Sequence, residues 1–123
     1  MMKFKLTIAI LATVLLIGGS IGETIYIRNT FEELQDRLES QMYNETYSLD
    51  EVKKLVSWWE KKAETLEIFI SVVQLNEITV TMGELIGAVK KEDYDSANAL
   101  FDRIYQYAVR INDMYMLKFN NIM

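Results

Sequence analysis

The apolar residues of this chain form one uninterrupted block near the N-terminus and, after it, stripes with helical spacing. Leu6 to Gly22 contains no charged residue, whereas every later segment mixes apolar and charged positions. Beyond the block, apolar residues recur at intervals of three and four, which is the period of a helix with one buried face. The pattern predicts an all-α protein, in which an N-terminal transmembrane helix continues into a small antiparallel three- to four-helix bundle. We divide the chain into a membrane segment, residues 1–27, and a helical bundle, residues 28–123.

The first helix of the bundle is predicted to continue from the membrane segment to about Met42. Its apolar stripe consists of Ile27, Phe31, Leu34, Leu38 and Met42. Residues 43–47 are polar and include Asn44, which predicts a turn. Ser48, followed three residues later by Glu51, has the pattern of a capping box and marks the start of the second helix.

The boundary between the second and third helices is the least marked in the sequence. From Leu66 to Leu75 nearly every position is apolar, which predicts a central helix in contact with neighbours on several sides. We place the next helix start at Asn76, although no glycine or proline separates the two helices and they could form one bent rod. Gly83 and Gly87, four residues apart, predict a close helix crossing in the third helix.

The fourth helix is predicted to begin at Asp93, a typical N-cap residue. Its apolar stripe consists of Ala97, Leu100, Ile104, Ala108, Ile111 and Met114, with Tyr107 beside it. Because four antiparallel helices bring the chain end back to the membrane, the methionine- and aromatic-rich residues 114–123 have three alternatives. They pack on the bundle, rest in the lipid headgroup layer or dock a partner.

The apolar block has the length of a short membrane span. Leu6 to Gly22 would rise about 25 Å as a helix, and continuation to Ile27 completes a hydrocarbon thickness of about 30 Å. Lys3 and Lys5 precede the block, so the positive-inside rule places the N-terminus in the cytoplasm. The sequence therefore predicts a single-pass protein of the cell membrane with its bundle outside.

A cleaved signal peptide is the alternative interpretation of the same block. Ser20 and Gly22 have the small side chains expected three residues and one residue before a cleavage site. Cleavage before Glu23 would release a secreted bundle. The helical apolar pattern nevertheless continues through this position as far as Leu38, which favours a retained anchor.

Composition argues against most catalytic chemistry. The chain has no histidine and no cysteine, so it lacks the commonest metal ligand, the usual general base and any thiolate nucleophile. The acidic turn of Glu92, Asp93 and Asp95 lacks the spacing and glycine of an EF-hand loop. We therefore predict that the chain is not an enzyme and uses no cofactor or metal.

Charge also limits the class of partner. Only two of the 13 basic residues, Lys3 and Lys5, precede the block, and all 18 acidic residues follow it. The part beyond Gly22 thus has a net charge of −7, which disfavours nucleic acid, because binding to it requires neutralised phosphates.

Three groups of residues are candidates for partner contact. Gly18 and Gly22 form a small-xxx-small pair that lets membrane helices approach closely. Trp58 lies beside Trp59, which falls on the core stripe, and exposed tryptophan is enriched at binding hot spots. The third group is in the tail and comprises Met114, Tyr115, Met116 and Phe119.

Two functions are compatible with these features. The first is a membrane-anchored accessory or adaptor protein that contacts the bilayer through residues 6–27 and binds a membrane-protein partner or a second copy. The alternative is an extracytoplasmic sensory or small-ligand-binding bundle, which would need a cavity between its second and fourth helices.

The chain also resembles a known family in its layout. The resemblance lies in the single span and in the segments Trp58-Trp59-Glu60-Lys61-Lys62, Leu75-Asn76-Glu77-Ile78 and Lys91-Glu92-Asp93-Tyr94 with Ala97 and Leu100 following. It is to an uncharacterised family, a domain of unknown function, of small single-span, membrane-anchored helical proteins from Gram-positive, often spore-forming, bacteria. Such proteins tend to have a histidine before the third helix, where this chain has Leu75-Asn76. The resemblance implies a partner, because members are often encoded beside a small multi-span membrane protein, and it implies no catalytic residues.

Overall fold

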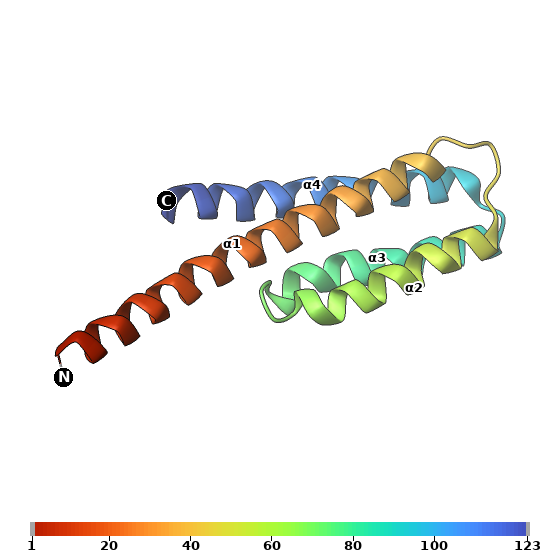
Figure 1. Cartoon of the computed structure of the whole chain (residues 1–123). Coiled ribbons are helices and arrows are strands. Elements are labelled where there is room, and N and C mark those ends of the chain that lie inside the picture. The colour runs from red at the N-terminus through yellow and green to blue at the C-terminus, as the bar shows by residue number, and fades with distance from the viewer. Residues whose placement is uncertain (1, 123) are drawn as a thin grey trace.

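Four helices make up the fold, in agreement with the predicted all-α class. The computed structural model describes the backbone of residues 2–122 and the side chains of residues 3–117. The helices are α1 (Met2–Gln41), α2 (Leu49–Leu66), α3 (Val72–Lys90) and α4 (Tyr94–Ile122). They pack as an up-down-up-down bundle, from which the first half of α1 projects alone (Figure 1).

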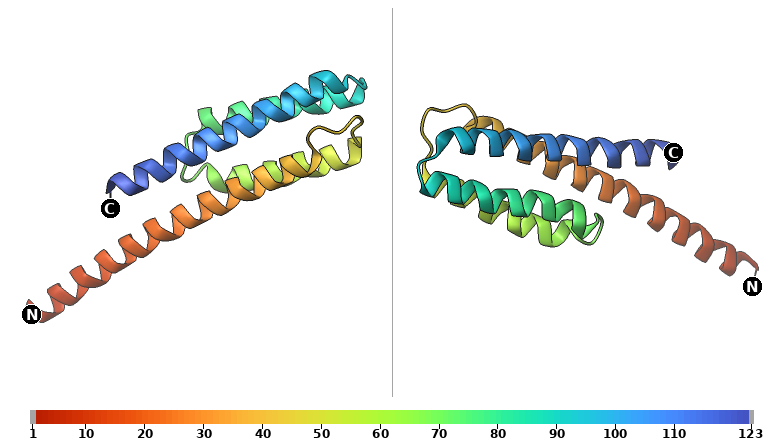
Figure 2. Two further views of the ribbon diagram at one scale, coloured as in Figure 1. Left: turned by 90° about the horizontal axis from the view of Figure 1, so that it is seen from above. Right: turned by 180° about the vertical axis from the view of Figure 1, so that it is seen from behind.

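The helices are arranged as a ring of sequence neighbours. α1 packs against α2 and α4, and α3 packs against the same two helices, so α1 stands diagonally opposite α3. The views from above and behind show both chain ends on the side of the bundle from which α1 projects (Figure 2). The chain end therefore returns to the side of the N-terminal apolar segment, as expected for four antiparallel helices.

α1 is one continuous rod with two different halves. Residues 3–22 are exposed throughout, and the helix is long and apolar enough to cross a membrane, a property that signal sequences share. The predicted stripe is buried throughout: Ile27, Phe31, Leu34 and Leu38 lie in the second half, and Met42 follows directly after the helix. The same helix therefore supplies both the apolar segment and one wall of the bundle core.

Large side chains fill the centre of the bundle. Trp59, Phe31 and Phe101 are wholly buried, and the rings of Phe31 and Trp59 lie 6.1 Å apart between their centroids. The indole Nε1 of Trp59 donates a hydrogen bond of 3.0 Å to Thr79 Oγ1, which joins α2 to α3. Trp59 is thus a core residue, as its position on the stripe predicts.

The predicted helix starts of α2 and α4 are both correct. The backbone N–H of Glu51 donates to Ser48 Oγ at 3.4 Å. Asp93 accepts at Oδ1 from the Ser96 backbone N–H at 3.2 Å and at Oδ2 from the Ser96 hydroxyl at 2.7 Å. Each cap satisfies a backbone donor that the first turn of a helix leaves without an intrahelical partner.

α3 ends in a Schellman motif whose left-handed residue is not glycine. Glu92 has a φ of 57°. Its N–H donates to the carbonyl of Val89 at 3.1 Å, and the N–H of Asp93 donates to the carbonyl of Ala88 at 2.9 Å. This pattern satisfies the last carbonyls of the helix, so the turn is well bonded even though a side chain occupies its strained position.

The predicted boundary at Asn76 is wrong, and the helix break lies nearer the N-terminus of the chain. α2 ends at Leu66, residues 67–71 form a tight turn, and Asn76 lies inside α3. The turn is bonded within itself, since the N–H groups of Phe69 and Ile70 both donate to the carbonyl of Leu66. The break falls in a stretch rich in β-branched and aromatic residues, which have lower helix propensity than the unbranched residues before it.

Two further predictions about packing are wrong. A Cβ atom added to Gly83 or Gly87 would meet nothing within 4 Å, so neither glycine marks a close helix crossing within the chain. On α4, Met114 is 41% exposed, while Phe101, which the predicted stripe omits, is fully buried. α4 therefore presents Phe101 to the core, and Met114 does not belong to its buried stripe.

Candidate functional site

The small-residue face of α1 is open. Gly18 and Gly22 are exposed, and a Cβ at either position would meet nothing within 4 Å. No other part of the described chain therefore occupies this face, which leaves room for a second helix to approach the α1 backbone.

Three threonine hydroxyls of the same part of α1 are bonded internally. The hydroxyls of Thr7, Thr13 and Thr24 donate to the carbonyls four residues earlier at 2.8, 2.8 and 2.9 Å. A hydroxyl in hydrocarbon has no water to bond, so these bonds remove the main polar cost of placing the segment in lipid. The chemistry of α1 between Leu6 and Gly22, which contains no charged residue, is thus compatible with a membrane interior.

Trp58 lies in the seam between α1 and α2 instead of on a free surface. The Arg37 guanidinium stands over its ring at 4.6 Å from the centroid, and Arg37 also pairs with Glu33 at 3.0 Å. Trp58 is half-buried and packs against the core. Cation–π stacking of this kind contributes about 0.5–1 kcal/mol at exposed sites. Only the remaining edge of the ring is available to a partner.

The tail residues are the end of α4 and contact the start of α3. Gln74 donates from Nε2 to the Met114 sulfur at 3.6 Å, and the Tyr115 hydroxyl donates to Gln74 Oε1 at 3.3 Å. Met116 is half-buried against the core, and the side chain of Phe119 lies outside the described residues. Of the three predicted alternatives for the tail, the structure shows packing on the bundle, at least as far as Met116.

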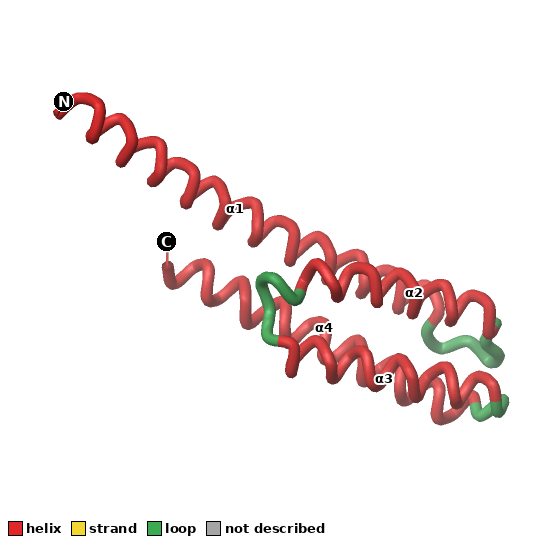
Figure 3. Tube along the Cα trace, turned by 90° about the horizontal axis from the view of Figure 1, so that it is seen from below, coloured by secondary structure: helices red, strands yellow, loops and turns green. Residues whose placement is uncertain are grey.

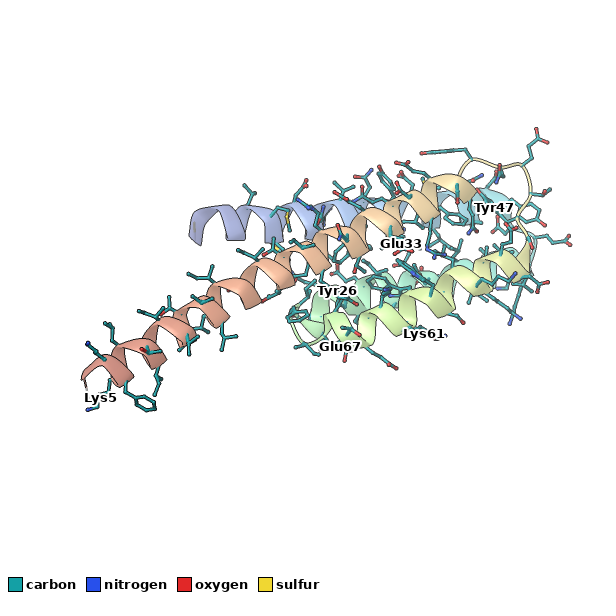
Figure 4. All side chains as sticks on the ribbon, viewed as in Figure 1. Lys5, Tyr26, Glu33, Tyr47, Lys61 and Glu67 are labelled. Atoms are coloured by element: carbon teal, nitrogen blue, oxygen red, sulfur yellow. The ribbon has the colours of Figure 1, made fainter. Side chains whose placement is uncertain are left out.

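The structure brings two of the three candidate groups to one end of the molecule. Lys5, Tyr26 and Glu33 follow one another along α1 towards the bundle (Figure 4). Gly18 and Gly22 precede Tyr26 on this helix, and the tail of α4 returns to the same end (Figure 2). Trp58, next to Arg37, lies farther up the bundle.

The α2–α3 turn is a candidate contact surface that the sequence reasoning missed. Its apolar residues Ile68, Val72 and Val73 are strongly exposed. In Figure 3 the turn is the green loop between α2 and α3, at the end of the bundle that faces the N and C labels. One sequence signal could have found it. Ser71 with Gln74 three residues later has the capping-box pattern, and Ser71 is the residue before α3, although its side chain makes no cap hydrogen bond.

Titratable groups with shifted pKa values lie away from this end and serve the fold. Hydrogen bonds from Ser96 lower the pKa of Asp93, and the bond from its hydroxyl to Glu39 raises the pKa of Tyr105. Burial raises the pKa of Tyr47, whose hydroxyl is bonded to Asn98. Among the described residues no three acidic side chains gather closely enough to hold a metal ion. That the chain needs no metal or cofactor stays a prediction.

The hollows in the described surface are open grooves between adjacent helices. One groove of about 460 Å³ runs between α3 and α4. Its lining residues are Val72, Val73, Asn76, Glu77, Val80, Thr81, Glu84, Arg103 and Tyr107. A groove of about 150 Å³ lies between α2 and α3. The bundle axis itself holds the large buried side chains of Trp59, Phe31 and Phe101.

Comparison with known proteins gives a family but no activity. No curated protein and no solved structure matches the chain. A family model, described as a domain of unknown function, matches residues 23–122, which covers the second half of α1 and all of the remaining bundle. Since the match spans most of the chain, this protein belongs to the DUF4363 family.

Proposed function

We propose that the protein is a non-enzymatic accessory or adaptor protein of the cell membrane, held by α1 as a single span. One observation carries this proposal: α1 continues without a break from an exposed apolar segment with an open glycine face into the core of the bundle. The absence of histidine and cysteine from the sequence supports the non-enzymatic part.

The orientation follows from charge. Lys3 and Lys5 lie before the apolar segment and all acidic residues lie after it, so the N-terminus is cytoplasmic and the bundle is outside. Retention of the segment is supported by the helix geometry, because α1 is helical on both sides of Glu23, where a signal peptidase would cut.

The partner is a membrane protein that packs on the glycine face within the bilayer. In lipid, helix association depends on close backbone approach and on van der Waals packing, since apolar residues gain nothing from leaving water there. The family resemblance supports a multi-span partner, because similar proteins are often encoded beside one. The alternative occupant of this face is a second copy of the same chain.

The test is purification of the tagged full-length chain from its native membranes in mild detergent. We expect an uncleaved chain that co-purifies with one membrane protein in constant ratio. The double variant Gly18→Leu/Gly22→Leu should lose that protein but stay in the membrane with unchanged helix content, because a Cβ atom at either position meets nothing within 4 Å.

Gly19→Leu is the matched control. Gly19 is equally open, but it lies about 100° around the helix from Gly18, on another face. Equal recovery of the partner with both variants would refute the glycine-face contact. A soluble chain that begins near Glu23 would refute the anchor itself.

The second candidate is an extracytoplasmic sensory or small-ligand-binding bundle. The groove between α3 and α4 is the feature that favours it, with Val80 and Tyr107 as apolar walls and Arg103 as a cation. The groove is shallow and open, whereas typical small-molecule sites enclose most of the ligand. Large side chains also fill the bundle axis, so this candidate has less support than the adaptor.

A further inference from the structure

The α2–α3 turn carries apolar side chains that the bundle leaves uncovered. Ile68, Val72 and Val73 are 75%, 57% and 74% exposed, and Phe69 is only half-buried. We name these four residues the apolar tip. Three strongly exposed apolar residues lie within six positions of one turn, and exposed apolar groups of this kind mark interaction sites.

The apolar tip lies at the height where α1 leaves its apolar segment. The rings of Phe69 and Tyr26 meet edge to face, with 6.3 Å between their centroids, and Lys62 Nζ lies 5.8 Å from the Tyr26 ring. Tyr26 and Glu67, next to the tip, appear together at this end of the bundle in Figure 4. The contact between Tyr26 and Phe69 therefore fixes the tip relative to α1.

The length of α1 sets the depth of the apolar tip relative to the membrane. From Leu6 to Tyr26 a helix rises about 30 Å, which equals the thickness of a hydrocarbon core of about 30 Å. With Leu6 at the inner boundary, Tyr26 reaches the outer one, where tyrosine is enriched. Glu23, about one helical turn earlier, then lies at the edge of the hydrocarbon core. The tip beside Tyr26 is then at the level of the outer lipid headgroups.

We propose that the apolar tip enters the headgroup layer of the outer membrane surface, so that the bundle touches the bilayer at a second point besides its span. This inference rests on the proposed anchoring of α1. Lipid is the occupant because the height of the tip is set by the span, and because a side chain at this level must meet either lipid or a protein lying on lipid.

The charged residues around the tip indicate which lipid headgroups it can contact. Glu64 and Glu67 are exposed beside it, and Lys62 is the neighbouring cation at the Tyr26 ring. The acidic side chains give anionic headgroups no advantage, so burial of Ile68 and Val73 provides the attraction. The contact should form on purely zwitterionic phosphatidylcholine.

The absence of cysteine from the sequence allows a direct test with single labelled cysteines. The full-length variants Ile68→Cys and Val73→Cys carry an environment-sensitive fluorophore and are placed in phosphatidylcholine nanodiscs. Quenching is compared between brominated phosphatidylcholine, which reports lipid, and iodide, which reports water. Val80→Cys is the matched control, since Val80 is also an exposed valine of α3, about 10 Å farther along the helix.

We expect the labels at positions 68 and 73 to lose emission to brominated lipid and to resist iodide, while the label at position 80 does the opposite. Helix content confirms that each labelled chain is folded. Labels at 68 and 73 that iodide quenches as strongly as the one at 80 would overturn the inference. So would labels protected from both quenchers, because a second copy of the chain would then cover the tip.

A label on Leu15→Cys, within the span, distinguishes failure of the tip contact from failure of the proposed membrane anchoring. If brominated lipid quenches the label at position 15 while iodide quenches the labels at positions 68 and 73, the tip contact alone is overturned. A Leu15 label that brominated lipid does not quench overturns the proposed anchoring and the tip contact together.

Discussion

Replacing Thr79 by valine tests the hydrogen bond that joins α2 to α3 in the core. Valine has nearly the shape of threonine, but it lacks the oxygen that accepts the indole N–H of Trp59 at 3.0 Å. Trp59 has no exposed surface, so water cannot replace the lost acceptor. The variant therefore keeps the packing and leaves a buried donor without a partner.

The magnitude follows from the burial of the donor. An unsatisfied buried N–H costs about 1–3 kcal/mol, and we expect Thr79→Val to lower the free energy of unfolding by about 2 kcal/mol. For a domain of about 100 residues, each kcal/mol lowers the melting temperature by roughly 4–8 °C. Thr79→Ser keeps the acceptor and is the control, with a smaller loss from one missing methyl group.

The assay is urea unfolding of the full-length chain in mild detergent, followed by helical circular dichroism. Trp59→Phe removes the donor, so adding Thr79→Val to this variant should cost about half of what it costs in the wild-type chain. The resulting cycle isolates the bond, with an expected coupling of about 1 kcal/mol. Equal costs of Thr79→Val with and without Trp59 would refute the role assigned to the hydrogen bond.

Two further predictions concern the turn between α3 and α4. Glu92→Gly should raise the free energy of unfolding by about 1 kcal/mol, because glycine adopts a positive φ without strain. Glu84→Gly, inside α3, should lower the free energy of unfolding by about as much. Thermal unfolding of both variants measures the difference. Since Ser96 lowers the pKa of Asp93 below its ordinary value of 3.8, the stability from this cap is present above 3.8 and is lost as the pH falls through the lowered pKa. Asp93→Asn should accordingly show a weaker loss of stability in acid unfolding than the wild-type chain, and identical acid profiles would contradict the assignment.

The helix starts of α2 and α4 could be predicted because they depend on a few adjacent residues. Ser48 with Glu51, and Asp93 before α4, combine an acceptor side chain with the backbone donors of the next turn. The buried stripe of α1 was equally predictable, because its period fixes which side chains share a face. These features need no knowledge of the rest of the molecule.

The α2–α3 boundary and its exposed residues could not be predicted in the same way. The apolar pattern runs through the turn, so Ile70 and Val73 look alike in sequence, yet the first is buried and the second is exposed. Which one is covered depends on the positions of α1 and α4, which are distant in the chain. The stacking of Arg37 on Trp58 is likewise a contact between helices that no local pattern indicates.

The unbroken course of α1 has a mechanical consequence. Between Glu23 and Gln41 it contains neither glycine nor proline, so this stretch has no hinge that could absorb a tilt of the apolar half of the helix. A change of about 10° in that tilt would swing the far end of the bundle, roughly 30 Å away by helix rise, through about 5 Å. α1 is thus stiff along its length. If a partner helix packs beside Gly18 and Gly22, as proposed, a movement of that helix would displace the far end of the bundle.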